Sequence, residues 1–169
     1  NNSSGTVISD DAKVNTNVYV TLNDGNDTGS IASGHYTTKY TVKKDGTNVT
    51  TDATGSNTYS AEGVYTVIVT TTDNSGRTST NNYTFMIDKT KPVCGSSSTF
   101  SSWINTDRTT SVACSDTGSK CTQSSFSQTF TSTAATGSIT IYDVAGNSNT
   151  CTVDVKVDKV KPSCGTATA

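Results

Sequence analysis

The chain has 169 residues, of which 12 are Lys or Arg and 14 are Asp or Glu, so its formal net charge is −2, and only 31% of its residues are hydrophobic. This balance, without a basic patch, excludes the electrostatic footprint of a nucleic-acid-binding protein. So low a hydrophobic fraction is typical of disordered chains, but here the apolar residues recur at every second position, which indicates folded β-strands.

Alternation of apolar and polar residues predicts strands along the whole chain, whereas helical spacing is nearly absent. The Lys44-Asp45-Gly46 segment predicts a hairpin turn, because Asp-Gly readily adopts the backbone that such turns need. Short alternating strands between turns indicate antiparallel sheets with one buried face, and hence an all-β sandwich. The apolar residues of the predicted strands are Val18, Val20 and Leu22, then Tyr40 and Val42, then Tyr65, Val67 and Val69, then Ile139 and Ile141, and finally Val153, Val155 and Val157.

An internal repeat divides the chain into two parts. The turn sequence Asp-Asn-Ser-Gly-Arg at 73–77 returns as Asp-Val-Ala-Gly-Asn at 143–147, and each copy leads to an Asp-Lys-x-Lys-Pro exit, at 88–92 and at 158–162. Turns and exits share one offset, since positions 73 and 143 differ by 70, as do positions 88 and 158. A period of this size is a whole small domain rather than one turn of a solenoid.

We therefore expect two domains, residues 1–89 and residues 90–159. Residues 160–169 follow as the truncated start of a third repeat, because Lys-Pro-Ser-Cys-Gly at 161–165 copies Lys-Pro-Val-Cys-Gly at 91–95. The second domain is near the lower size limit for a self-sufficient hydrophobic core, so crosslinks within it would contribute strongly to its stability.

The second domain contains four of the five cysteines, and sequence alone allows three ways of pairing them. A zinc site is disfavoured, because the cysteines lack the short pairwise spacing of zinc knuckles and the only histidine lies in the first domain. We therefore expect structural disulfides, which imply an oxidising, extracellular setting. The five cysteines are Cys94, Cys114, Cys121, Cys151 and Cys164.

The two copies resemble bacterial immunoglobulin-like (Big-type) repeats of surface proteins. The resemblance rests on the D-x-A-G-N turn, the strand after it, the Asp-Lys-Thr-Lys-Pro exit, and the Asp-Thr-Gly-Ser turns at 27–30 and 116–119. The second copy, with Trp103 and with Cys-Ser-Asp-Thr-Gly-Ser-Lys-Cys at 114–121, resembles a cysteine-bearing variety. The resemblance covers nearly the whole chain. It implies an all-β protein of two tandem immunoglobulin-like antiparallel β-sandwiches, the second smaller than the first and stapled by disulfides.

The implied fold also suggests how the cysteines pair. In an immunoglobulin-like sandwich the start of the first strand, the second loop and the last turn lie at one pole, so the four cysteines of the second domain would gather there. We expect the pairs Cys94–Cys114 and Cys121–Cys151, with Cys94–Cys151 and Cys114–Cys121 as the alternative. Cys164 is the equivalent of Cys94 in the truncated repeat and is expected to be unpaired.

A calcium site is a candidate at the same pole. The implied fold would bring Asp116 and Asp143 there together with Asp88 from the preceding domain's exit, and three carboxylates plus turn carbonyls suit an ion that takes six to eight oxygen ligands. Asp27 and Asp73 would be the equivalent residues of the first domain. The alternative is that each aspartate bonds the backbone of its own turn, as Asp readily does. No other cofactor is expected.

An intramolecular isopeptide bond is a second hypothesis for the first domain. Lys13 on the first strand and Asn81 on the last are the residues that it would join. It also needs a buried acid beside them, and none is evident, so a solvated lysine and a polar strand-end asparagine are the simpler interpretation.

Catalysis finds little support, and we expect a protein that is not an enzyme. The single histidine, His35, cannot supply a Ser-His-Asp arrangement in both repeats, and the paired carboxylates lie in turns without an apolar pocket to raise a pKa. Trp103 and Phe100 would suit a sugar-stacking surface, but Trp more often fills the core of a small sandwich, and we expect that role.

The sequence thus favours a structural spacer or stalk of a secreted or wall-attached bacterial protein, projecting a distal functional domain. We expect a monomer whose partners are the neighbouring repeats of its own chain, with no contact to nucleic acid or membrane. The alternative is an adhesin-type binding module, in which the longer middle segment of the first domain, residues 31–63, recognises a glycan or host surface protein through Tyr36 and Tyr40.

Overall fold

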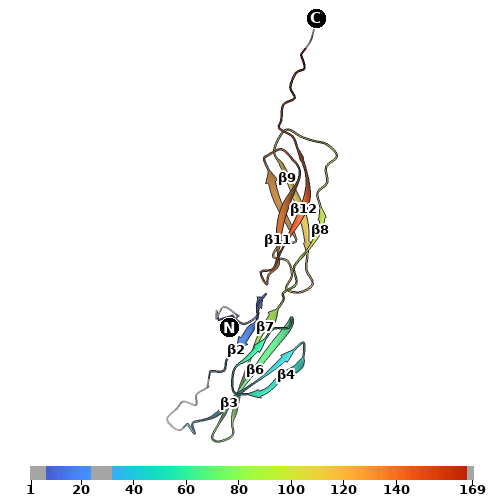
Figure 1. Ribbon diagram of the computed structural model, residues 1–169. Helices are drawn as coiled ribbons and strands as arrows, with labels where there is room; N and C mark the ends of the chain where they lie inside the picture. The colour runs from blue at the N-terminus through green and yellow to red at the C-terminus, as the bar shows by residue number, and fades with distance from the viewer. Residues whose placement is uncertain (1–6, 24–31, 167–169) are drawn as a thin grey trace. The chain divides into compact units, whose positions relative to one another are not determined.

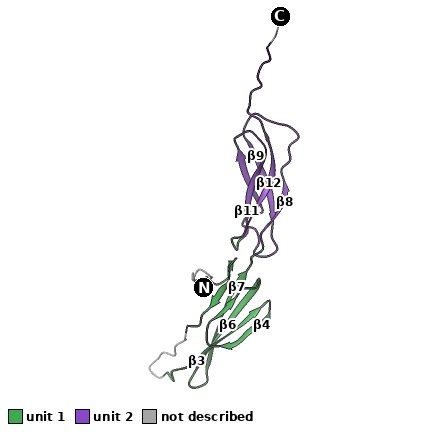
Figure 2. Ribbon diagram, viewed as in Figure 1, with its two compact units in different colours: residues 1–90, 144–146 green, residues 91–143, 147–169 purple. Residues whose placement is uncertain are grey.

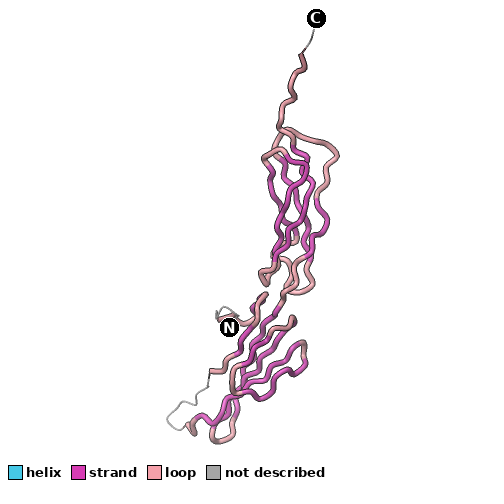
Figure 3. Tube along the Cα trace, in the orientation of Figure 1, coloured by secondary structure: helices cyan, strands magenta, loops and turns pink. Residues whose placement is uncertain are grey.

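The structure is a computed structural model that describes residues 7–23 and 32–166, and within these ranges it contains strands, turns and loops but no helix (Figure 3). The chain forms two compact units, residues 1–90 with 144–146 and residues 91–143 with 147–169 (Figure 2). The described residues include no helix long and apolar enough to cross a membrane. The all-β prediction is confirmed, while the Asp-Thr-Gly-Ser turn at 27–30 lies outside the described residues.

In the first unit the described strands form two sheets (Figure 1). The strands are β1 (Ala12–Val14), β2 (Val18–Val20), β3 (His35–Lys44), β4 (Thr47–Ala53), β5 (Asn57–Tyr59), β6 (Gly63–Asp73) and β7 (Thr78–Ile87). One sheet has the order β1–β7–β6–β3–β4, in which β1 runs parallel to β7 and the other neighbours are antiparallel. The other sheet pairs β2 with β5.

The core of the first unit is built from alternate residues of both sheets, as the period-2 pattern predicts. Leu22, which we expected in a strand, lies just beyond the end of β2 but still packs against this core. The predicted turn between β3 and β4 is also confirmed, since Asp45 and Gly46 have φ of 49° and 84°, the left-handed values that a type I′ turn requires. The buried core residues are Val18, Tyr40, Val42, Tyr59, Tyr65, Val67, Phe85 and Ile87.

Tyr65, near the start of β6, fixes the connection that precedes this strand. Its hydroxyl donates a hydrogen bond to the backbone oxygen of Ala61 at 2.8 Å. Its ring stacks on that of Phe85 on β7, with 4.8 Å between centroids and 5° between planes. The side chain therefore anchors the loop before β6 and fills the core at the same time.

The second unit also has two sheets, and its described strands are β8 (Val93–Ser97), β9 (Arg108–Ser115), β10 (Ser125–Phe130), β11 (Ala134–Tyr142) and β12 (Ser148–Val157). One sheet has the order β10–β9–β8, and the other pairs β11 with β12. The buried core comes from both sheets and consists of Val112, Ile139, Ile141, Cys151, Val153, Val155 and Val157. A Cβ at Gly137 would lie 2.2 Å from the Phe130 ring, so any larger residue there would displace that ring.

The second unit differs from the first in the middle segment. In the first unit β3 pairs with β6 over almost its whole length and carries β4 on its other side. At the corresponding side of β11 lies a loop, which meets the strand through a bridge between Cys121 and Asp143 and a hydrogen bond from Thr122 N to Tyr142 O of 3.0 Å. The middle segment of the first unit is longer than that of the second because it contains the β3–β4 hairpin. The described residues of the second unit have no counterpart of this hairpin.

The two Asp-Lys-x-Lys-Pro exits form the same local structure in each unit. The backbone N–H of Asp88 donates to Val14 O at 2.9 Å, and that of Asp158 donates to Ile104 O at 2.8 Å. Each aspartate also accepts, on Oδ1, the N–H of the residue two positions on, at 3.1 Å for Asp88 and 2.9 Å for Asp158. Such side-chain turns are characteristic of Asp. The repeated exit sequence therefore ties the end of the last strand to β1 in the first unit, and to the segment at Ile104, which follows β8, in the second.

Candidate functional site

The second unit contains two disulfides, but they are not the pairs that we favoured. Cys94 is bonded to Cys151, with 5.8 Å between Cα atoms, and Cys114 is bonded to Cys121, with 6.2 Å. This is the alternative connectivity, and the expected pairs Cys94–Cys114 and Cys121–Cys151 are wrong. Cys164 is free and exposed.

The two bridges join different parts of the unit. Cys94 and Cys114 lie directly opposite each other on β8 and β9, but each is bonded to a cysteine outside this strand pair. Cys94 and Cys151 belong to different sheets and meet across the core. The first bridge therefore joins the two sheets.

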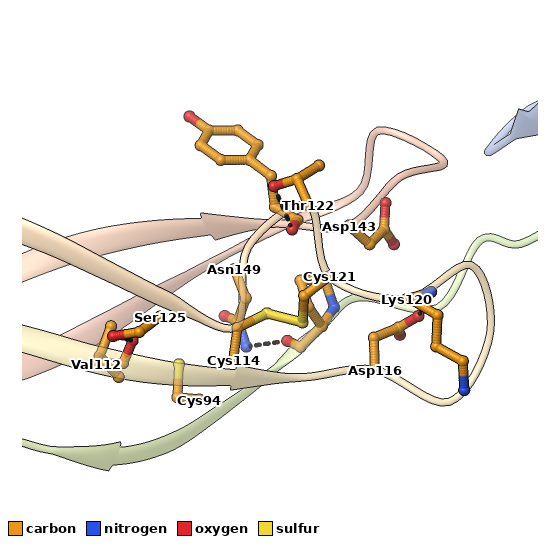
Figure 4. Close-up of a disulfide and its surroundings, with 12 residues drawn as sticks. Cys94, Val112, Cys114, Asp116, Lys120, Cys121, Thr122, Ser125, Asp143 and Asn149 are labelled. Atoms are coloured by element: carbon orange, nitrogen blue, oxygen red, sulfur yellow. Dashed lines mark hydrogen bonds between the residues drawn. A yellow bond between two sulfur atoms is a disulfide. The ribbon is translucent and has the colours of Figure 1, made fainter.

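The second bridge closes the loop that stands in place of the β3–β4 hairpin. Figure 4 shows the Cys114–Cys121 bridge, with Asp116 on the loop and Asp143 at the end of the neighbouring strand. Within the loop, the N–H of Lys120 donates to Asp116 Oδ2 at 2.8 Å, and Lys120 has a φ of 76°. The bridge, seven positions long in sequence, thus holds a tight turn against β11 where the first unit uses two strands.

The aspartates of the repeated turns bond their own turns. Both oxygens of Asp143, which is 2% exposed, accept hydrogen bonds from Asn147, from its backbone N–H and from its side-chain amide, each at 2.7 Å. Asp73 Oδ1 accepts the N–H groups of Ser75 and Arg77, and its Oδ2 accepts the Arg77 guanidinium at 2.8 Å. These contacts give the repeated turn sequence a structural role in both units.

Asp73 should make the first unit sensitive to acid. The Ser75 hydroxyl, together with the backbone and guanidinium of Arg77, holds the pKa of the Asp73 carboxyl well below its ordinary value. A lowered pKa means that the ionised group stabilises the fold above its unfolded pKa of about 3.9, and that this contribution is lost as the pH falls further. Urea unfolding from pH 6 down to pH 2 should show a shallower acid-dependent loss of stability for Asp73→Asn than for the wild type. Parallel pH profiles would contradict this assignment.

Calcium binding by Asp88, Asp116 and Asp143 stays a prediction. Within the second unit, carboxylate oxygens of Asp116 and Asp143 lie within 4.8 Å of each other, close enough to share one ion. Asp88 belongs to the first unit and bonds Thr90. For the first-unit equivalents, Asp27 lies outside the described residues.

Thermal unfolding in excess calcium and in chelator tests this prediction. A bound ion stabilises the folded state by about 2.7 kcal/mol when its concentration is about 100 times the dissociation constant, so calcium should raise the melting temperature of the second unit. The rise should disappear in Asp116→Ala and persist in the matched control Asp73→Ala. Superimposable curves with and without calcium would leave the aspartates as turn residues only.

The two tyrosines proposed for ligand binding lie in different surroundings. Tyr36 on β3 is 70% exposed, whereas Tyr40 on the same strand is 1% exposed, and its hydroxyl accepts a hydrogen bond from the Asn57 side chain at 2.7 Å. The expectation that Tyr40 contacts a ligand is therefore wrong, because Thr38, Tyr40 and Val42, at alternate positions of β3, are all buried. His35 begins the same strand, and its ring nitrogen Nε2 lies 2.9 Å from the Thr38 hydroxyl.

Trp103 and Phe100, near the start of the second unit, do not fill its hydrophobic core. Trp103 is 53% exposed, and the Arg108 guanidinium covers the Phe100 ring at 4.0 Å from its centroid. The core between the sheets contains the Cys94–Cys151 bridge instead. The expectation of a buried Trp103 is wrong.

The isopeptide hypothesis fails on strand register. Lys13 lies opposite Met86, whereas Asn81 is five positions further back on β7, opposite Val69 of β6. Five positions along a strand span about 16 Å. Both residues are exposed, so neither has the buried setting that the reaction needs.

Comparisons with known proteins find only distant structural similarity, at low identity. No family model matches the chain, and no curated protein matches it. The chain is similar to fibronectin(III)-like modules of Clostridium thermocellum CbhA, at 11% identity and a TM-score of 0.39, over 96% of this chain and 97% of that one. It is also similar to Bacteroides ovatus SGBP-B of a mixed-linkage glucan utilization locus, solved with a mixed-linkage heptasaccharide, at 14% identity and a TM-score of 0.31. That match covers 94% of this chain and 45% of the other.

Proposed function

We propose that this chain is a pair of tandem immunoglobulin-like β-sandwiches that serve as a load-bearing spacer in an extracellular bacterial surface protein, projecting a distal functional domain. The observation that carries the proposal is the way the first and last segments are joined in each unit. In the first unit β1 runs parallel to β7, with Ala12, Lys13 and Val14 opposite Phe85, Met86 and Ile87. In the second, the segment that follows the first strand β8 forms a parallel bridge with the end of β12, between Ile104 and Val157, and the Cys94–Cys151 bridge joins β8 itself to β12.

Parallel pairing of the entering and leaving segments has a mechanical consequence. When the two ends of a unit are pulled apart, two parallel neighbours must slide along each other, so their hydrogen bonds are loaded together in shear instead of being opened one after another. The second unit adds a covalent connection, because Cys94–Cys151 joins its first strand β8 to its last strand β12. The first unit therefore resists stretching through the β1–β7 pairing, and the second resists it through the Cys94–Cys151 bridge, because Ile104 lies within the segment that the bridge keeps out of the load path.

The cysteines support the extracellular setting. Disulfides form and persist in oxidising compartments and are rare in the cytosol. Two bridges within one small unit indicate a protein that matures outside the cytoplasm and uses covalent bonds to supplement a limited core. The Tyr65–Ala61 hydrogen bond supports the immunoglobulin-like assignment, since a tyrosine near the start of the sixth strand that bonds the backbone a few residues upstream is a hallmark of that fold.

An adhesin-type binding module remains the second candidate. The specific observation in its favour is Tyr36, an exposed aromatic side chain on β3, which belongs to the hairpin absent from the described part of the second unit. Aromatic side chains on an added element of a rigid scaffold are frequent contacts for glycans and proteins.

Retention of the chain on arrayed glycans and host surface proteins separates the two candidates. A spacer should show no saturable retention. An adhesin should be retained, and Tyr36→Ala should abolish retention without changing the melting temperature, while Tyr142→Ala, an exposed tyrosine of the second unit, serves as the matched control. Retention that survives Tyr36→Ala would exclude this residue as the binding site.

A further inference from the structure

The four cysteines that form the two disulfides contain a third neighbouring pair. The disulfides are Cys94–Cys151 and Cys114–Cys121, with Cα atoms 5.8 and 6.2 Å apart. The third pair is Cys94 and Cys114, which lie directly opposite each other on β8 and β9 (Figure 4). The cysteines thus follow one another in space as a row, in the order Cys121, Cys114, Cys94 and Cys151.

The backbone of Cys114 shows that the third pair is a close one. Its N–H donates at 2.9 Å to the backbone oxygen of Ser124, which directly precedes β10. Because both backbone groups of a residue in an antiparallel sheet point to the same neighbour, those of Cys114 point away from β8. Cys94 and Cys114 are therefore a non-hydrogen-bonded pair, the kind with the shorter Cα separation, about 4.5 Å. Since disulfides span about 4.4–6.8 Å between Cα atoms, Cys94 is within bonding reach of Cys114 as well as Cys151.

The side chains of this pair point in the same direction. Residues directly opposite each other in an antiparallel sheet project from the same face. Here that face is the inner one, because Cys94 and Cys114 both pack against the core of the second unit, and Cys151 is a buried member of that core. The Cys114 sulfur is therefore on the same side of the sheet as the Cys94–Cys151 bridge.

The cysteines differ in their access to a thiol in solution. Cys151 is 3% exposed, whereas the other three are partly exposed. Of these three, Cys94 and Cys114 pack against the described core of the second unit, and Cys121 lies in the loop between the exposed residues Lys120 and Thr122. Thiol–disulfide exchange begins on a sulfur that the attacking thiolate can reach. Cys121 is therefore the sulfur at which an external thiol enters.

We propose that the four cysteines form a thiol–disulfide relay, in which a low-molecular-weight thiol that reacts at Cys121 opens the Cys94–Cys151 bridge. The external thiolate attacks the sulfur of Cys121, forms a mixed disulfide with it and expels the thiolate of Cys114. Cys114 then attacks the sulfur of Cys94, forms the Cys94–Cys114 bond and expels Cys151. Two disulfides are present before and after, so nothing is oxidised or reduced overall, and Cys151 takes up the proton that the external thiol lost.

The core accommodates the product of the exchange, and the exchange is reversible. A free cysteine behaves as a small apolar side chain and is among the residues most often buried, so Cys151 stays in place between the sheets. When the external thiol is removed, Cys151 attacks Cys94 and expels Cys114. Cys114 then attacks the mixed disulfide at Cys121 and expels the external thiol, which restores both original bridges.

The exchange moves a crosslink from one pair of strands to another. Cys94–Cys151 joins β8, the first strand of the second unit, to β12, the last, across 57 positions. Cys94–Cys114 joins β8 only to its neighbour β9, across 20 positions, and leaves the other 37 outside the crosslink. The relay itself is independent of the spacer role. Its consequence rests on the proposed function, because the lost bridge is the one that would bear load.

Two matched variants of the whole chain test the relay, both in a Cys164→Ser background that removes the exposed free thiol. Cys121→Ser leaves Cys114 as a permanent thiol, which is the state after the first step. Cys114→Ser removes the same bridge but leaves the thiol at Cys121 instead. Both are incubated at about pH 8.5, the ordinary pKa of a cysteine thiol, then quenched with acid, unfolded and alkylated.

Mass spectrometry of the cleaved chains locates the bonds. Cleavage after Arg108 and Lys120 places Cys94, Cys114 and Cys151 on three separate peptides, and the alkylated cysteine identifies the free thiol. In the Cys121→Ser variant, at least about one chain in ten, a tenfold ratio, should contain Cys94–Cys114 with a free Cys151. The Cys114→Ser variant should contain Cys94–Cys151 only.

Two results would overturn the proposal. Cys94–Cys151 alone in both variants would show that Cys114 does not reach Cys94. Equal rearrangement in both variants would show scrambling through the unfolded chain instead of transfer between neighbours.

A second measurement keeps all four cysteines and so does not depend on the folding of either variant. Brief treatment of the Cys164→Ser chain with glutathione should give glutathione on Cys121 together with a Cys94–Cys114 bond. Glutathione on Cys121 with Cys94–Cys151 intact, or glutathione on Cys94, would contradict the relay. These outcomes leave the spacer role untouched, because that role is tested by stretching the oxidised chain.

Discussion

Replacing Cys94 and Cys151 together by alanine is expected to lower the free energy of unfolding of the second unit by about 4 kcal/mol, because their bridge spans 57 positions and closes a long loop in the unfolded chain. Replacing Cys114 and Cys121 should cost about 2 kcal/mol, because that bridge spans only seven positions. Urea unfolding followed by the fluorescence of Trp103, the single tryptophan of the chain, reports on the second unit. Equal losses, or the reverse order, would contradict this ranking.

The connectivity has a separate check in the same variants. In the oxidised Cys94→Ala/Cys151→Ala protein, Cys114 and Cys121 should remain bonded, so thiol titration should detect Cys164 as the only free thiol. The opposite double variant should give the same count. The pairs Cys94–Cys114 and Cys121–Cys151 would instead leave two unpaired cysteines in each variant, in addition to Cys164.

Tyr65→Ala should destabilise the first unit by about 3–5 kcal/mol, the range for removing a large buried aromatic side chain. The loss has two parts, which Tyr65→Phe separates. The phenylalanine keeps the stacking on Phe85 and removes only the hydroxyl bonded to Ala61 O, so it should cost about 1 kcal/mol. Chemical unfolding followed by circular dichroism measures both variants.

An exposed tyrosine of the neighbouring strand provides the control. Tyr83→Ala on β7 removes a ring of similar size that is not part of the buried core, and its effect should stay within about 0.5 kcal/mol. If Tyr65→Phe cost as much as Tyr65→Ala, the hydrogen bond rather than the packing would dominate. If Tyr65→Ala cost no more than Tyr83→Ala, the described core would be incorrect.

Local features of the fold were predictable from the sequence because they depend on neighbouring residues. Alternation placed the strands that contain Val18, Tyr40, Tyr65, Ile139 and Val153, and the Asp-Gly pair identified the turn between β3 and β4. That the repeated aspartates bond their own turns is one of the two interpretations that the sequence allows. The hydrogen bond between Tyr65 and Ala61 is also local, since the residues are four positions apart, but alternation alone does not predict it.

Features that depend on which strands are neighbours were harder to predict. The cysteine pairing turned on whether Cys94 faces its sheet neighbour Cys114 or the opposite sheet, and sequence spacing carries no signal for that choice. The exposure of Trp103 has the same origin, because its segment runs beside the end of β12 instead of entering the core. The sequence shows that the middle of the second unit is shorter than that of the first. Only the topology shows that the segment it lacks corresponds to the β3–β4 hairpin.

Stretching single molecules of the chain between its two ends tests the spacer proposal most directly. In the oxidised chain, the first unit should unfold in one abrupt step, and the second should lengthen little, because Cys94–Cys151 keeps 57 positions out of the load path. Adding a reductant should release those positions, about 200 Å at roughly 3.5 Å per residue. Full extension of the second unit without reductant, or gradual lengthening of the first unit at low force, would contradict a load-bearing spacer.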